Sequence, residues 1–351
     1  DGFCGSGMTG VAAQLCGDRE AVESLGYKID NDGVVYDVSV GGNGETVWRE
    51  ISKLGSRRAI LNDLSPAATF IADNYANLHV MPVFAVEALR VTARVENELR
   101  WLYEGVSGGR VLNAVWSDVF LCPNCSRELI YWDAALAGGI LREAFPCTHC
   151  TAILGKAPSR TSGAAKLERA FVTSLDPVLN KTVRVPKLTL VQQTVDTRST
   201  RVTAPIDSCQ EDPLQSRFHG VSWPPVPTDE FFPGRQTNKL INGSGISHIC
   251  HMYTPRALFA YGHLWQCRLS SYRHTSLFAF CLSAINNYIS RKQGYFGGGG
   301  GVSGTLFTPS IHLERNVFDV LKRKIKRLSS LAVARFERTC LPTQSVSGLR
   351  N

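Results

Sequence analysis

Two pairs of cysteines carry the clearest chemistry in this chain. Cys122-Pro-Asn-Cys125 and Cys147-Thr-His-Cys150 are C-x-x-C pairs, and 21 residues separate them. Two such pairs can place four thiolates at the corners of a tetrahedron, as in a structural zinc ribbon. Other interpretations of the two pairs exist. A redox site is less favoured because it needs only one pair. Four unligated thiols, or a ribbon that has lost its metal, would show the same spacing. The spacing predicts a structural Zn²⁺ site on Cys122, Cys125, Cys147 and Cys150.

Histidines near cysteines are weaker signals of a metal site. His149 lies inside the second pair, and we expect it to be exposed or to lie outside the ligand shell. The run His248-Ile-Cys250-His251 has no further ligand at a useful spacing. We therefore expect packing or hydrogen bonding from that run.

A glycine-rich turn opens the chain. The stretch Gly5-Ser-Gly7-Met-Thr-Gly10 has the spacing G-x-G-x-x-G, which lets a backbone approach a ligand before the start of a helix. Asp1 precedes it, where an acid can orient the turn or bind an ammonium group. Asp63 ends the apolar run Ala59-Ile-Leu61, and an acid at the tip of a second strand can bond two ribose hydroxyls. In a nicotinamide site that acid follows after about 20 residues, but here an insert at 27–48 lengthens the gap.

Hydrophobic periodicity and turn residues predict the elements that position these groups. The N-terminal expectations are a turn and helix over 1–17, a small β insert over 27–48, a short buried strand over 58–64, and a helix from Ser65-Pro66 to about Tyr75. Further on we expect a helix over 84–104, a strand over 111–121 interrupted at Ser117-Asp118, strands and loops over 155–245, helices over 255–292, a glycine loop at 297–301, and a basic amphipathic helix over 313–338.

Composition and charge limit the class of protein. The chain has 351 residues, of which 44% are hydrophobic, enough for a sizeable core. It contains no apolar run long enough for a spanning helix and no signal peptide, and its 11 cysteines suit a reducing compartment, so we expect a cytoplasmic protein without a membrane partner. Residues 241–351 hold 14 basic and 3 acidic residues, a net charge of +11, which favours either an anionic partner or a solvated basic surface.

The opening turn and the segment that ends at Asp63 also resemble a known family. Asp1-Gly-Phe-Cys-Gly-Ser-Gly-Met-Thr-Gly-Val-Ala-Ala13 is similar to motif I of S-adenosylmethionine-dependent DNA amino-methyltransferases of the N-4/N-6 type. The stretch from Arg58 to Ala72 resembles the following segment of that family. Shorter matches at residues 115–120, both cysteine pairs, 253–256 and 304–310 resemble its large prokaryotic form with an inserted zinc ribbon. One difference is Gly2, where related motifs often have proline.

The resemblance implies a cofactor site and a class of reaction. It places Asp1, Phe3, Gly5 and Gly7 at the methionine end of S-adenosylmethionine, Asp63 at the ribose, and Leu64 and Ser65 near the adenine. The family transfers the methyl group to an exocyclic amine of a DNA base, and adenine N6 is favoured here over cytosine N4. The target base must leave the stack for this chemistry.

The catalytic motif of that family, (Asp/Asn/Ser)-Pro-Pro-aromatic, does not occur in this sequence. The single Pro-Pro, in Trp223-Pro-Pro-Val226, lacks both the polar and the aromatic neighbour. Cys340-Leu-Pro-Thr-Gln-Ser345 resembles the strand that precedes the motif, and its Gln344 and Ser345 could approach the adenine. We therefore expect the motif beyond Asn351, in a longer gene product of which this chain is an inactive fragment.

Together these patterns predict an α/β protein with a partial class I, Rossmann-like methyltransferase core, an inserted zinc ribbon and a mixed α+β insert. The expected parts are the S-adenosylmethionine-binding part (1–78), a helical connector (79–117), the zinc ribbon (118–155), a mixed insert with DNA contacts (156–312), and a basic helix with a return strand (313–351). Two different functions also fit these patterns: a non-catalytic zinc-ribbon protein that binds nucleic acid, and a methyltransferase that acts on RNA or protein.

Overall fold

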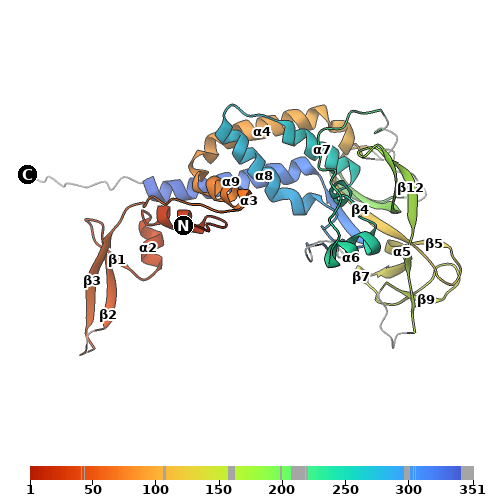
Figure 1. Ribbon diagram of the computed structural model, residues 1–351, viewed down its shortest axis with the longest axis horizontal. Coiled ribbons are helices and arrows are strands. Elements are labelled where there is room, and N and C mark those ends of the chain that lie inside the picture. The colour runs from red at the N-terminus through yellow and green to blue at the C-terminus, as the bar shows by residue number, and fades with distance from the viewer. Residues whose placement is uncertain are drawn as a thin grey trace, which may run out of the picture. The chain divides into compact units, whose positions relative to one another are not determined.

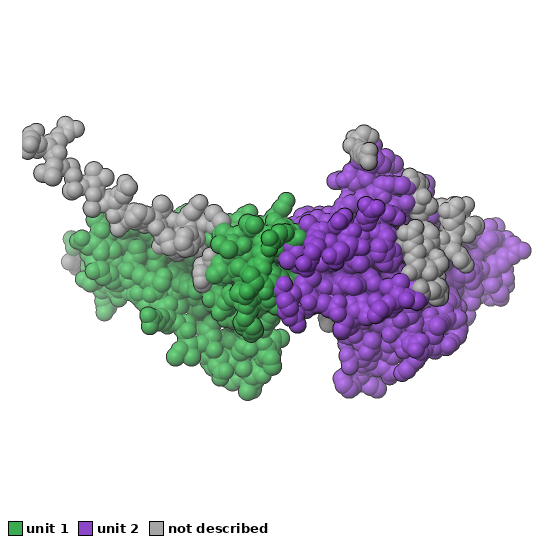
Figure 2. All heavy atoms as spheres, turned by 90° about the horizontal axis from the view of Figure 1, so that it is seen from above, with its two compact units in different colours: residues 1–90, 269–281, 324–351 green, residues 91–268, 282–323 purple. Residues whose placement is uncertain are grey.

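The computed structural model describes most of the chain: residues 1–40, 42, 44–105, 108–156, 163–197, 200–206, 218, 220–295, 301, 302, 304 and 306–340. Helices take up 38% of the chain and strands 27%, so the fold is mixed α/β, in agreement with the expected class. The chain forms two compact units, coloured separately in Figure 2. Unit 1 comprises residues 1–90, 269–281 and 324–351, and unit 2 comprises residues 91–268 and 282–323. The expected division into five parts stays a prediction.

Unit 1 begins with the glycine turn and helix α1 (Met8–Leu15), as expected. Helix α2 (Arg19–Ser24) follows, and the Asp18 carboxylate caps it by accepting the Ala21 N–H. The β insert is an antiparallel sheet in the order β1-β2-β3, which confirms that prediction. Its strands are β1 (Lys28–Ile29), β2 (Val34–Val40) and β3 (Thr46–Lys53), seen in Figure 1.

The buried strand predicted over 58–64 is wrong. The segment is extended but is not part of a named strand, and Ile60 and Leu64 are each 89% exposed. Its backbone pairs with residues 1–4 and Leu61 lies partly buried against Gly10 of α1, but Ile60 and Leu64 stay exposed, so hydrophobicity alone does not bury them.

Helix α3 (Pro66–Ala76) begins where the sequence predicts, because the Ser65 hydroxyl accepts the Ala68 N–H and Pro66 occupies the first turn. Unit 1 also holds η1 (Leu78–Val80) and parts of α4 (Met81–Glu98), α8 (Tyr272–Ile289) and α9 (Val317–Cys340). Its core joins α3 to α8: the Tyr75 and Phe280 ring centroids lie 5.2 Å apart. The buried Asn74 amide donates to the Ser276 hydroxyl at 3.1 Å.

Unit 2 is built around strand β4 (Arg110–Leu121), which crosses its six-stranded sheet (Figure 1). Four strands pair directly with β4: β5 (Glu128–Ile130), β11 (Glu168–Arg169), β14 (Leu188–Asp196) and β16 (Ile311–Arg315). Strand β15 (Arg201–Pro205) extends the sheet beside β14. The predicted interruption of β4 at Ser117-Asp118 is wrong: both residues are buried within the strand. Ser117 Oγ accepts the Trp132 N–H at 2.9 Å, and Asp118 forms an ion pair with Arg169, so both polar groups are tolerated there.

Short elements complete unit 2. They are η2 (Arg100–Tyr103), α5 (Tyr131–Ala135), β6 (Leu136–Ala137), β7 (Ile140–Leu141), β8 (Phe145–Pro146), β9 (Ile153–Gly155), β10 (Ala165–Lys166), β12 (Phe171–Asp176), β13 (Lys181–Pro186), α6 (Arg235–Ser244), η4 (Ile249–Met252) and α7 (Pro255–Gln266). Among the strands that the structure names, β9 and β10 are the one parallel pair, and the rest are antiparallel. The Rossmann-like core therefore stays a prediction.

The basic helix starts later than its sequence indicates. Residues 311–315 form β16, and α9 begins at Val317, because pairing with β4 buries His312 and Leu313 in the sheet. Most of the expected apolar stripe is buried, but Leu331 is 58% exposed. The predicted return strand and the residues Gln344 and Ser345 lie outside the described residues, as does most of the glycine loop. None of the helices in the described part of the chain is long and apolar enough to cross a bilayer.

Candidate functional site

The four predicted ligands, Cys122, Cys125, Cys147 and Cys150, come together in two loops of the same shape. The first loop joins β4 to β5, and the second joins β8 to β9. In each, the residue after the second cysteine has a left-handed backbone, Ser126 at φ 59° and Thr151 at φ 62°. That residue donates its N–H to the carbonyl of the first cysteine, at 2.8 and 3.2 Å respectively. Two matching knuckles therefore aim their thiols at one point.

The sulfur positions fit a tetrahedral metal site. All four Sγ atoms lie within 4.8 Å of one another. The Sγ atoms of Cys122 and Cys150 are 3.7 Å apart, and those of Cys125 and Cys147 are 3.9 Å apart. Zinc–sulfur bonds of about 2.3 Å in a tetrahedron place the sulfurs about 3.8 Å apart. The donor set is therefore able to hold a divalent metal ion such as Zn²⁺.

Neighbouring donors favour the thiolate form of Cys150, whereas the pKa of the Cys125 thiol is raised to about 11 by burial and by the neighbouring thiols. The Asn124 amide donates to Cys150 Sγ at 3.4 Å and lowers the pKa of that thiol to about 6. The His149 N–H donates to Cys147 Sγ at 3.4 Å. The exposed His149 ring lies 3.0 Å from the Glu128 carbonyl, so it is outside the set of four ligands, as expected.

The cysteine cluster is anchored in a buried core. Cys122 and Cys147 are 1% and 2% exposed, and they pack in one core with Phe145 and Leu154. This core continues into the main sheet through Val115 and other buried side chains. Four thiols are enough to fill the coordination shell of a tetrahedral metal ion.

The N-terminal turn lies beside the segment that ends at Asp63. The Asp1 nitrogen donates to the Ile60 carbonyl at 2.9 Å, and the Asn62 N–H donates back to the Asp1 carbonyl at 2.9 Å. This alternation is the hydrogen-bond pattern of two parallel strands. The carboxyl ends of both segments therefore meet at one place, and α1 and α3 start from there.

The Asp63 carboxylate links the two segments. It accepts the Gly5 N–H at 3.0 Å and the Ser65 N–H at 2.9 Å. The hydrogen bond from the Ser65 N–H, followed in size by that from the Gly5 N–H, lowers the pKa of Asp63. The carboxylate is therefore ionised at neutral pH. A carboxylate has about four acceptor positions, so each oxygen retains capacity for a hydroxyl donor.

The glycines are required by the backbone of the turn. Gly5 and Gly7 have φ of 52° and 79°, in the left-handed region. A Cβ atom on Gly7 would lie 2.6 Å from the Ala72 Cα in α3. Gly7 thus allows the close contact between the turn and α3. The Asp1 carboxylate fixes the start of the turn by accepting the Phe3 N–H and the Thr9 hydroxyl.

Two further predicted cofactor residues lie on the surface near these groups. Phe3 is 79% exposed and Leu64 is 89% exposed. Ser65 acts as the cap of α3, so its hydroxyl already has a partner. The structure thus brings Asp1, Gly5 and Asp63 into one hydrogen-bonded group and leaves the two apolar side chains accessible for contact.

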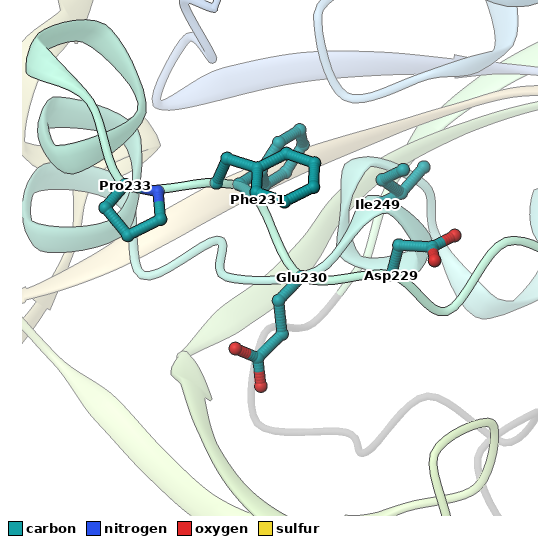
Figure 3. A pocket seen from close by; sticks show the side chains of 6 residues that line it. Asp229, Glu230, Phe231, Pro233 and Ile249 are labelled. Carbon is teal, nitrogen blue, oxygen red and sulfur yellow. The ribbon is translucent and has the colours of Figure 1, made fainter.

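The run His248–His251 makes hydrogen bonds, as expected. His251 Nε2 lies 2.9 Å from the Asp176 carboxylate, and His248 Nδ1 lies 2.9 Å from the Ser247 hydroxyl. Cys250 is buried, which raises the pKa of its thiol to about 11. A pocket of about 530 Å³ lies beside this run and is lined by Asp229, Glu230, Phe231, Phe232, Pro233 and Ile249. Figure 3 labels all of these residues except Phe232. Both acidic side chains there are exposed.

The sequence does not predict one polar cluster that the structure contains. Asp118, Arg169, Arg291 and His312 are all buried in unit 2, although they come from four separate stretches of sequence. The one visible signal is the Ser117-Asp118 step in an apolar run, and by itself that step predicts a strand break.

Comparisons with known proteins identify no family for this chain. No family model matches it, and neither the curated proteins nor the solved structures include a significant match.

Proposed function

We propose that this chain is the donor-binding and zinc-ribbon part of an S-adenosylmethionine-dependent DNA methyltransferase. The acceptor is an exocyclic amine of a DNA base, adenine N6 in preference to cytosine N4. The metal is structural, because four thiols complete its coordination.

The observation that carries this proposal is the shared end of the two parallel segments. A glycine turn with a left-handed backbone and an ionised carboxylate meet there, at the starts of α1 and α3. A nucleoside ligand needs a carboxylate that accepts hydrogen bonds from its ribose diol and a backbone that can approach its remaining groups closely. Asp63 and the turn from Asp1 to Gly7 supply both.

The exposed apolar side chains suit the rest of the ligand. Phe3 and Leu64 flank the carboxylate and the turn in sequence and expose most of their surface. The adenine ring would pack against Leu64 with a gain of apolar burial, and Phe3 would do the same for the methionine end. The Asp1 carboxylate is an acceptor for the ammonium group of the methionine moiety.

DNA as the partner is supported by charge. Helix α9 presents exposed Lys326 and Arg327, within a C-terminal third of net charge +11. Such residues contact phosphates without reading sequence.

A second candidate, a zinc-ribbon protein that binds nucleic acid without catalysis, is favoured by the absence of an (Asp/Asn/Ser)-Pro-Pro-aromatic motif from these 351 residues. Transfer of a labelled methyl group to DNA, measured on the longest reading frame that contains the chain, separates the two. Incorporation supports the enzyme, and donor-independent DNA binding without incorporation supports the second candidate.

Calorimetry with S-adenosylmethionine tests the donor site directly. We expect Asp63→Ala to weaken donor binding by about tenfold or more, because charge-assisted bonds to the ribose are lost. Asp37→Ala is the matched control, since Asp37 is an exposed acid of the same unit on β2 and should leave the affinity unchanged. Heat with a nicotinamide dinucleotide but none with S-adenosylmethionine would overturn the proposal.

A further inference from the structure

A second polar cluster, in unit 2, is independent of both the ribbon and the N-terminal turn. It contains Asp118 of β4, Arg169 of β11, Arg291, and His312 of β16, and each of these side chains is more than nine-tenths buried. Strand register places Asp118, Arg169 and His312 on one face of the sheet. His312 pairs with Trp116, the Asp118 N–H donates to the Ser310 carbonyl, and Arg169 pairs with Phe120. Residues two apart on β4 share a face, so their partners do too.

Positive charge exceeds negative charge in this cluster. Asp118 and Arg169 form an ion pair that neutralises both. Besides burial, the charges of Asp118 and Arg169 shift the pKa values of Arg291 and of the partly exposed Lys156. All four groups therefore lie within electrostatic reach of one another. Two cations therefore remain after the single acid is paired. A buried cation without a counter-charge is costly, so a complementary anion would stabilise this arrangement.

Unused hydrogen-bonding atoms surround these charges. Arg291 Nε, both ring nitrogens of His312 and the Ser310 hydroxyl have no partner among the described residues, although all three side chains are buried. Burial lowers the pKa of Arg291 to about 10 and lowers that of His312, so the imidazole is neutral and carries one N–H. Buried polar atoms are normally satisfied, and a ligand is one way to satisfy several at once.

Lys156 connects the cluster to the surface. Its side chain is partly exposed, and Nζ lies 6.0 Å from the Tyr131 ring centroid and 5.7 Å from that of Phe307. Phe307 is 47% exposed, so the ammonium lies at the accessible side of the cluster.

We propose that this cluster is a binding site for a phosphate-class oxyanion, held by Arg291 and Arg169, with Ser310 and His312 as further donors and Lys156 at its entrance. Guanidinium groups match the oxygen geometry of a phosphate, and several N–H and O–H donors satisfy a tetrahedral anion. The site does not depend on methyl transfer. The phosphate has two sources, a free anion and the backbone of a nucleic acid.

Equilibrium dialysis of the full chain against labelled inorganic phosphate, at constant ionic strength in chloride, tests the site. We expect saturable binding of one phosphate, weakened by about tenfold or more in Arg291→Met and in Lys156→Met because charge-assisted bonds are lost. Arg94→Met is the matched control, since it removes an exposed arginine on α4 in the same unit, and it should bind phosphate as the parent does. Lys156→Met is a second variant, at a partly exposed position, and it keeps the test decisive if Arg291→Met does not fold.

The outcomes are distinct. No saturable phosphate binding above chloride, or equal affinity in the parent and in folded Arg291→Met, overturns the site. A short single-stranded oligodeoxynucleotide that competes with phosphate identifies the nucleic-acid backbone as the source, and failure to compete identifies the free anion. Donor calorimetry on the same variants reports on the N-terminal turn separately, so failure of one proposal leaves the other standing.

Discussion

At the scale of single residues, the best-defined site is the group of four cysteines. Its geometry depends on two residues that are not ligands, Ser126 and Thr151, whose left-handed backbones close the two knuckles. Such a conformation is uncommon outside glycine, and it persists where the surrounding structure requires it. The knuckles therefore hold the thiols in place through the backbone as well as through packing.

Replacement of one ligand should remove the metal. We expect the parent chain to contain about one zinc ion and Cys122→Ser to lose it, because three thiolates and a hydroxyl bind zinc far more weakly. Elemental analysis of the purified proteins measures the stoichiometry, and the melting temperature should fall with it. Cys16→Ser is the control, since Cys16 is a partly buried cysteine outside the ribbon. Full zinc content in Cys122→Ser would refute the four-thiolate site.

At the scale of elements, polar side chains decide where strands turn. Asp176 ends β12, and its carboxylate accepts the Val178 and Leu179 N–H groups in the turn to β13. Its other oxygen lies 2.9 Å from His251 Nε2. Burial raises the pKa of Asp176, but the bonds from His251, Leu179 and Val178 lower it by more, and the net shift is downward.

This shift predicts how acid affects the β12–β13 hairpin. A carboxyl whose pKa is lower in the folded state than its unfolded value of 3.8 stabilises the fold above that pH, and the stabilisation is lost as the pH falls through the folded value. We therefore expect Asp176→Asn to lower the free energy of unfolding at pH 7. Below about pH 4 the parent should lose stability as Asp176 is protonated, whereas Asp176→Asn should lack this part of the loss. Urea unfolding across this range measures both. Parallel pH curves for Asp176→Asn and the parent would contradict the assignment.

At the scale of the whole molecule, the three candidate sites divide between the two units. The four cysteines and the buried cluster of Asp118, Arg169, Arg291 and His312 belong to unit 2, whereas the glycine turn and Asp63 belong to unit 1. Each unit has its own core, so a ligand that stabilises one is not required to stabilise the other.

Removal of the metal should therefore act on one unit. We expect a strong chelator to increase hydrogen exchange in β4, β5, β8 and β9, because the ribbon core packs against the metal ligands. Helices α1 and α3 should keep their exchange rates. Hydrogen–deuterium exchange with mass spectrometry resolves these segments. A uniform increase across both units would show that the chain unfolds as one cooperative body.

Much of this protein follows from local sequence. The two C-x-x-C pairs predict a four-cysteine cluster able to hold a metal ion, because two knuckles at this spacing commonly hold one, and the structure brings their sulfurs together. Ser65-Pro66 and the turn residues around 27–48 specify α3 and the β insert, because caps and turns act within a few residues.

Tertiary structure alone decided the remainder. Ile60 and Leu64 are apolar yet exposed, and residues 313–315 have a helical pattern yet form a strand. Burial and pairing depend on which distant segment lies alongside. Asp118 shows the same limit: it resembles a strand break until Arg169, 51 positions later in the sequence, supplies the opposite charge. Local propensity acts over a few residues, whereas the partners that bury a charge or complete a sheet come from anywhere in the chain.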